Sequence, residues 1–137
     1  MDRKEVKELA VTAAKARLLA VEAVHRCASG HPGGSLSVMD ALTVLYFHTM
    51  RIDPANPADP DRDRFVLSKG HCTPALYSIL ALRGYYDVKE LELFRSIDGH
   101  MSGHPDMVNV KGVDMSTGSL GQGISAAVGM ALAGKAD

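Results

Sequence analysis

Three of the histidines that directly follow a glycine in this 137-residue chain stand in recognisable motifs: His31 in SGHPGG, His71 in SKGHCTP and His104 in SGHPD. A glycine lets the backbone bend sharply, which leaves the neighbouring imidazole accessible. Because an imidazole can donate, accept or transfer a proton near neutral pH, these residues are candidate catalytic groups. One such histidine is most often a structural or surface residue, but three in the same setting favour a shared function.

The other three histidines are interpreted as non-catalytic. His100 lies four residues before His104, a spacing that would place both rings on one face of a helix. However, a glycine precedes each of the two and a proline follows the second, and the glutamate of the HExxH zinc motif is absent. We therefore expect no histidine metal site. His25 and His48 fall inside expected helices and are interpreted as ordinary helix residues.

A glycine-rich segment, STGSLGQG at residues 116–123, precedes an expected helix of small residues that begins near Leu120. Free backbone N–H groups at a helix start suit a phosphate or another anion. The segment is not a Walker A loop, because no Gly-Lys-Ser/Thr follows, and it does not match GxGxxG after a strand. It therefore predicts a ligand loop whose ligand stays open at this point.

The elements that must position these residues are mostly helices. Apolar residues spaced three or four apart predict a long helix over residues 3–28. A second helix is expected from a capping box at Ser37 and Asp40 to about Met50. A third is expected to run from an N-cap at Thr73 to Arg83 and to end at a glycine. Another capping box is expected downstream, formed by Asp87 and Glu90.

One strand is expected, at residues 65–67, after a loop at 53–63 that holds three prolines and four aspartates. Residues 96–118 show no periodic pattern. A single strand cannot form a sheet, and helices that alternate with strands belong to α/β proteins. We therefore predict that residues 1–137 are the incomplete front part of an α/β domain.

Composition excludes several classes of protein. With 15 basic and 16 acidic residues the net charge is −1, unlike that of a dedicated nucleic-acid binder. The charged start MDRKEVKE is unlike a signal peptide, and the longest apolar run is about half of the roughly 20 residues that span a bilayer. Two cysteines without a CxxC spacing, Cys27 and Cys72, favour a reducing, cytoplasmic setting.

Four motifs in chain order together resemble the N-terminal part of transketolase: SGHPGGSLS, SKGHCTPALYSIL, SGHPD and STGSLGQGISAAVGMALAGK. The resemblance begins near residue 10 and extends to the end. It is especially close to the thiamine-diphosphate-binding half that some organisms make as a separate subunit. It implies a thiamine-diphosphate-binding α/β fold, mostly helical in this portion. It also implies transfer of a two-carbon ketol unit from a ketose phosphate to an aldose phosphate, as in the pentose phosphate pathway.

The resemblance also implies roles for individual residues. His31 would lie beside the reacting substrate and help to move protons, and His71 would lie by the diphosphate. His104 would hydrogen-bond the ketose donor near its first hydroxyl. The backbone of Gly118, Ser119 and Leu120 would line the aminopyrimidine side of the cofactor, with the Leu120 side chain packed on the cofactor rings. Full-length enzymes often have proline at the position of Ser119.

The family holds the diphosphate through a divalent cation, Mg²⁺, with ligands from a GDG motif and a downstream asparagine. Neither is identifiable here, and Asp137, which follows Lys135 and Ala136, does not form that motif. The activating glutamate belongs to the pyrimidine-binding part, so the resemblance implies a C-terminal part or subunit as partner. The family places its active sites between two chains, so the resemblance also implies a dimer. The isolated chain is expected to be inactive. The alternatives are a deoxyxylulose-phosphate or dihydroxyacetone synthase, an inactive chain that keeps only the fold, and a histidine-metal protein.

Overall fold

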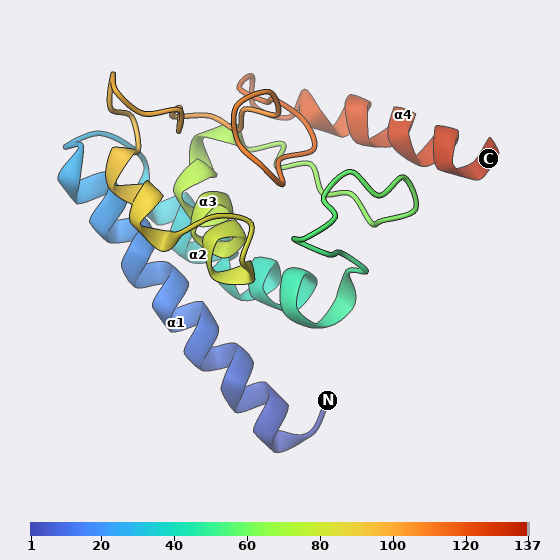
Figure 1. Ribbon diagram of the computed structural model, residues 1–137, viewed down its shortest axis with the longest axis horizontal. Helices are drawn as coiled ribbons and strands as arrows, with labels where there is room; N and C mark the ends of the chain where they lie inside the picture. The colour runs from blue at the N-terminus through green and yellow to red at the C-terminus, as the bar shows by residue number, and fades with distance from the viewer. Residues whose placement is uncertain (137) are drawn as a thin grey trace.

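The computed structural model describes residues 1–136, which form a mostly helical body with long irregular connections (Figure 1). No strand is present among these residues. In chain order the helical elements are α1 (Arg3–Arg26), α2 (Pro32–Val44), the π-helical turn η1 (Leu45–Thr49), the short 3-10 helix η2 (Gly70–Cys72), α3 (Thr73–Arg83), the 3-10 helix η3 (Val88–Leu93) and α4 (Gly123–Ala136).

Helix α3 lies at the centre of the core and packs against both α1 and α2. Its residues 73–81 are all buried, among them Leu76, Tyr77 and Ile79. Helix α1 faces this core with alanines, which let its backbone approach closely; they are Ala13, Ala16, Ala20 and Ala23. Full burial of a leucine or isoleucine side chain contributes about 1.5–3 kcal/mol, so this apolar core supplies the main stabilisation.

Several sequence predictions about helix ends are confirmed. The long first helix is α1, which begins after Asp2, whose side chain accepts a hydrogen bond from the Glu5 amide at 2.8 Å. Helix α3 ends at Gly84, whose φ of +99° suits a residue without Cβ. The capping box of Asp87 and Glu90 is present at the start of η3.

Other predicted helix starts are wrong. Helix α2 begins at Pro32, five residues before Ser37, because a proline is already set for the first helical turn. The Ser37 hydroxyl lies inside the helix and donates to the Gly34 carbonyl at 3.0 Å. Thr73 is the first helical residue of α3 rather than its cap. Helix α4 begins at Gly123, not near Leu120, because Gly121 has a φ of +88°, which is incompatible with a right-handed helix.

The predicted strand at 65–67 is also not formed in the described residues. The segment runs without a backbone ladder, because side chains from residues 114–117 take up some of its polar groups. The Asp114 carboxylate accepts from the Phe65 amide at 2.7 Å, and the Thr117 hydroxyl donates to the Leu67 carbonyl at 2.7 Å. Segment 65–67 is therefore fixed beside the stretch that leads into the glycine-rich loop.

Helix α4 extends along one side of the molecule and ends away from the α1–α3 core (Figure 1). Within the helix only Gly123 is buried, while Ile124, Val128 and Leu132 are exposed. Across residues 1–136, no helix combines the length and the apolar character that a bilayer crossing requires.

Candidate functional site

His31 and His71 lie side by side although 40 positions separate them in the chain. His31 is the residue directly before α2, and His71 lies in η2, directly before α3. Their ring centroids are 5.2 Å apart, and the ring planes meet at 75°. His31 is exposed and His71 is half-buried, so the pair borders solvent where a ligand could reach both imidazoles.

The start of α2 packs tightly against η2, and this fixes the histidine pair. The Lys69 ammonium donates to the Gly34 carbonyl at 3.0 Å. A Cβ on Gly34 would lie 2.5 Å from the Sγ of Cys72 and 3.7 Å from the Nε2 of His71. Glycine is therefore required where the two elements meet. Burial raises the pKa of the Cys72 thiol, although the nearby Lys69 partly opposes that shift.

The glycine-rich loop at 116–123 lies on the segment that precedes His71. Besides the bond from Thr117 to the Leu67 carbonyl, the Gly121 amide donates to the Ser68 carbonyl at 3.0 Å. A Cβ on Gly70 would lie 2.9 Å from the Thr117 hydroxyl oxygen, and one on Gly123 would lie 3.0 Å from the Cα of Ser68. The loop and the histidine segment are thus in van der Waals contact.

His104 reaches the same loop from the third histidine motif. Its backbone carbonyl accepts from the Tyr77 hydroxyl at 3.0 Å and from the Ser102 hydroxyl at 2.6 Å. A Cβ on Gly118 would lie 3.9 Å from the Cδ2 of the exposed His104 ring. Because Tyr77 is a buried residue of α3, this carbonyl contact fixes the histidine backbone to the core. Burial raises the pKa of Tyr77 to about 12, so its hydroxyl keeps its proton.

The three candidate histidines therefore lie near one another: His104 lies beside the glycine-rich loop, His71 lies in segment 65–71, which contacts that loop, and His31 contacts His71. Gly118, Ser119 and Leu120 are exposed, and Leu120 keeps 74% of its surface open to solvent. The catalytic roles of the three histidines and the cofactor-binding roles of His71, Gly118, Ser119 and Leu120 stay predictions.

The remaining histidines lie outside this cluster of contacts. The His100 ring is 3.3 Å from the Glu90 carboxylate, and the His48 ring is 2.8 Å from Glu5. His25 lies within α1, and His48 lies within η1. Residues 1–136 contain no group of three or more acidic, histidine or cysteine side chains that could hold a metal ion. Asp137, considered above for the GDG motif, lies outside the described residues.

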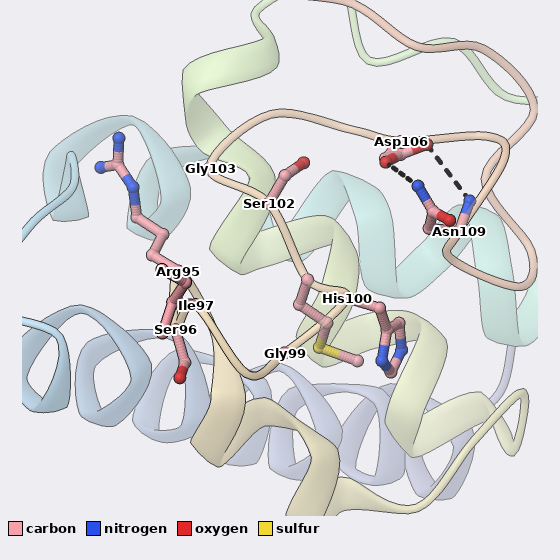
Figure 2. A pocket seen from close by; sticks show the side chains of 10 residues that line it. Arg95, Ser96, Ile97, Gly99, His100, Ser102, Gly103, Asp106 and Asn109 are labelled. Carbon is pink, nitrogen blue, oxygen red and sulfur yellow. Dashed lines mark hydrogen bonds between the residues drawn. The ribbon is translucent and has the colours of Figure 1, made fainter.

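A hollow of about 630 Å³ adjoins the His104 segment and is lined mainly by residues 95–103 (Figure 2). The Arg95 guanidinium donates to the Ser29 hydroxyl at 2.8 Å, and its backbone has a φ of +56°, unusual for a residue with a side chain. A Cβ on Gly103 would lie 2.6 Å from the Nε of Arg95. The stretch before His104 is therefore folded closely around this arginine.

Two kinds of supporting residue carry no local signal in the sequence. Lys69 stands in the quoted SKGH motif, but its contact with Gly34 depends on folding that the motif does not specify. The Arg62–Asp114 ion pair joins positions 52 residues apart, and no local spacing pattern marks it.

Comparison with known proteins shows the family to which the chain belongs. Residues 7–137 match the family described as "Transketolase, thiamine diphosphate binding domain". The chain is 52% identical over 121 residues to 6-deoxy-6-sulfo-D-fructose transketolase subunit SqwG of Clostridium sp. (strain MSTE9), covering 88% of this chain and 44% of that one. It is 42% identical over 133 residues to one of the subunits of apulose-4-phosphate transketolase from Phocaeicola vulgatus, covering 97% and 47% respectively.

Among solved structures, the Pichia stipitis transketolase complex with sedoheptulose-7-phosphate superposes with a TM-score of 0.84 at 45% identity. That match covers 89% of this chain and 18% of the Pichia chain. The chain therefore belongs to the transketolase family and has the fold of the N-terminal portion of its thiamine diphosphate binding domain. It spans less than half the length of the two subunit relatives.

Proposed function

We propose that this chain is the thiamine-diphosphate-binding part of a transketolase, which transfers a two-carbon ketol unit from a ketose phosphate to an aldose phosphate. The observation that carries the proposal is that the 116–123 loop packs against the segment of His71, whose ring contacts His31, and lies beside the ring of His104. Two relatives that are themselves named transketolase subunits support it. Residues 1–137 then form one portion of a larger thiamine-diphosphate-binding domain.

The chemistry of the loop fits one side of thiamine diphosphate. Leu120 offers an exposed apolar side chain for the cofactor rings, beside backbone groups of Gly118 and Ser119. In this proposal His71, whose segment packs against the loop at Gly70, contacts the diphosphate. When bound, the cofactor supplies the nucleophilic carbon that attacks the ketose carbonyl, while the protein supplies orientation and proton handling.

In this proposal the three imidazoles move protons on the substrate's hydroxyl oxygens. Cleavage of a carbon–carbon bond next to a hydroxyl requires that hydroxyl to lose a proton, and addition to an aldose requires the reverse. His31 is assigned to this proton transfer, because its exposed ring contacts His71 and faces solvent. His104 is assigned to the first hydroxyl of the donor, where it also stabilises developing negative charge.

In this family Mg²⁺ neutralises the diphosphate. Residues 1–136 contain no group of three or more acidic, histidine or cysteine side chains that could hold such an ion. We assign its ligands to other parts of the complete enzyme, and the activating glutamate to a pyrimidine-binding part or subunit. We further propose an active dimer in the cytoplasm, where the free cysteines Cys27 and Cys72 stay reduced. This chain alone then binds the cofactor weakly and has no turnover.

The test is reconstitution with a pyrimidine-binding partner, thiamine diphosphate and Mg²⁺. The expected result is ketol transfer between sugar phosphates that depends on both the partner and the cofactor. A complete mixture without transfer from any donor ketose would overturn the proposal.

A sulfonated ketose is the second candidate donor, because the 52% identical relative is named for 6-deoxy-6-sulfo-D-fructose. Parallel assays with a ketose phosphate and its sulfonated counterpart decide between them. A much higher kcat/KM for one donor assigns the substrate class, since a phosphate and a sulfonate differ in charge at the same end of the sugar.

A further inference from the structure

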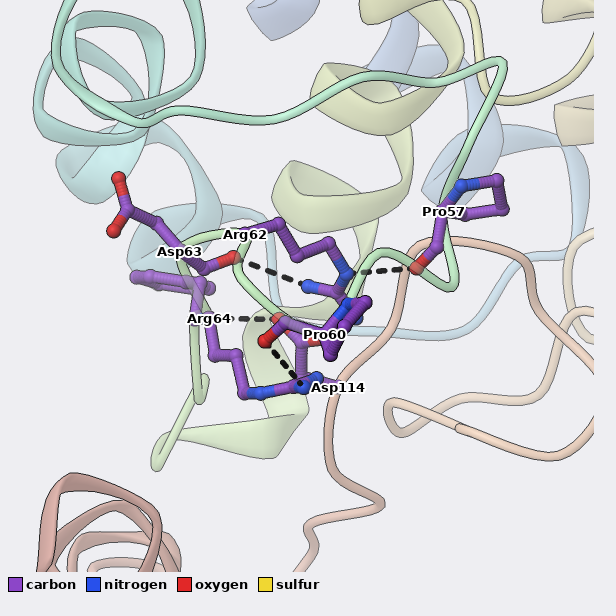
Figure 3. A network of polar contacts seen from close by, with 7 residues as sticks. Pro57, Pro60, Arg62, Asp63, Arg64 and Asp114 are labelled. Atoms are coloured by element: carbon purple, nitrogen blue, oxygen red, sulfur yellow. Dashed lines mark hydrogen bonds and ion pairs between the residues drawn. The ribbon is translucent and has the colours of Figure 1, made fainter. Parts of the chain in front are cut away.

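A buried ion pair joins Arg62 to Asp114, just before the glycine-rich loop in the chain (Figure 3). The side chain of Arg62 is 11% exposed and that of Asp114 is 3% exposed. One terminal nitrogen of Arg62 donates to the Oδ1 of Asp114. Its Nε donates to the Pro57 carbonyl at 2.7 Å, and its other terminal nitrogen donates to the Asp63 carbonyl at 3.1 Å. The guanidinium is therefore held in one orientation by three partners.

The second oxygen of Asp114 performs a different task. Its Oδ2 accepts the Phe65 amide at 2.7 Å, so one carboxylate joins the 57–63 loop to the start of the segment that leads to His71. Asp114 lies two residues before Ser116, where the glycine-rich loop begins. The ion pair therefore lies at the start of the two segments that form the candidate site, which are segment 65–71 and the 116–123 loop.

Three hydrogen bonds, one after another along the chain, hold these two segments side by side. Asp114 bonds the Phe65 amide, Thr117 bonds the Leu67 carbonyl, and the Gly121 amide bonds the Ser68 carbonyl. The first of these involves a charged, buried acceptor, which is the strongest type of hydrogen bond of the three. Because a buried charge left without its partner is costly, the position of Asp114 is also the least free to shift.

We propose that Asp114, oriented by Arg62, is a positioning residue that sets the register of the 116–123 loop against segment 65–71. The inference rests on the proposed function in that this register places the cofactor loop beside His71. An asparagine at 114 keeps the shape but presents one acceptor where the site uses two, since its amide nitrogen must face either the guanidinium or the Phe65 N–H.

The test compares D114N with D40N in the full chain. The control removes an Arg–Asp contact of 2.7 Å between Arg17 and Asp40, on the exposed surface of α1 and α2. Amide hydrogen exchange is read at Gly121, whose N–H bonds Ser68, and in the buried helix α3. D114N is expected to speed exchange at Gly121 about tenfold, which corresponds to loss of one strong hydrogen bond, with α3 unchanged and D40N without effect.

Unchanged exchange at Gly121 would overturn the proposal, and so would equal acceleration in the loop and in α3, which would make the pair a general stabiliser. Should D114N fail to fold, R62K keeps the charge but loses the forked contacts, and a smaller acceleration at Gly121 alone is expected. In the reconstituted enzyme, D114N is expected to raise the KM for thiamine diphosphate more than it lowers kcat. If the wild-type mixture is inactive while the exchange result holds, the proposed function fails and the positioning role stands.

Discussion

At the scale of single residues, the catalytic roles of the candidate histidines stay predictions, and the sequence does not mark the side chains that hold them in place. His31, His71 and His104 each follow a glycine; the His31 ring contacts His71, the His71 segment packs against the glycine-rich loop at Gly70, and the His104 ring lies beside Gly118 of that loop. The contacts that hold them were not predictable from spacing. The Tyr77 hydroxyl bonds the His104 carbonyl across 27 positions, and such a bond exists only once α3 has been packed against the later loop.

The first prediction concerns the His104 ring. Only its backbone carbonyl is used in hydrogen bonds to Tyr77 and Ser102, so H104A leaves those two contacts in place. In the reconstituted enzyme we expect H104A to raise the KM for the donor ketose roughly tenfold or more, as for the loss of one good hydrogen bond. Initial-rate kinetics measure this, with circular dichroism to confirm the fold. A donor KM equal to that of the wild type would remove His104 from substrate binding.

At the scale of elements, helices were predictable where the signal is local and not where it is tertiary. The 3.6-residue periodicity of α1 and the glycine stop of α3 were read correctly, because both depend on neighbouring residues. The Ser37 capping box was wrong because Pro32 starts α2 earlier. The strand at 65–67 was wrong because its partners among residues 114–117 are side chains from far along the sequence.

The second prediction tests the junction between α2 and η2. G34A places a methyl group 2.5 Å from the buried Cys72 sulfur, whereas G33A meets nothing within 4 Å. Overpacking costs about 1–3 kcal/mol, while an alanine for a free helical glycine gains about 0.5–1 kcal/mol. We therefore expect G34A to lower the free energy of unfolding and the adjacent control G33A to raise it. Urea titration followed by circular dichroism measures both.

A second change identifies the cause. Cys72 is fully buried beside Gly34, so C72A creates room at that contact and is expected to recover part of the stability lost in G34A. Strict additivity of the two changes would mean that the loss arises elsewhere than at this contact. Equal stability of G34A and G33A would contradict the close approach itself.

At the scale of the whole molecule, burial divides the chain into two parts of unequal stability. The α1–α3 body has a continuous apolar core, whereas α4 buries only Gly123 and exposes three large apolar side chains. A helix of this length is marginal in water without tertiary packing. The glycines at 129 and 134 weaken it further, because each costs about 1 kcal/mol relative to alanine.

The third prediction follows from that division. In the isolated chain, amides of α4 are expected to exchange at least about a hundredfold faster than amides of α3, because local opening of α4 exposes almost no buried surface. G129A, at a position with open space around it, is expected to slow exchange in α4 about fivefold and to leave α3 unchanged. Comparable protection of α3 and α4 in the wild type would show that α4 is held by packing which its exposed residues do not reveal.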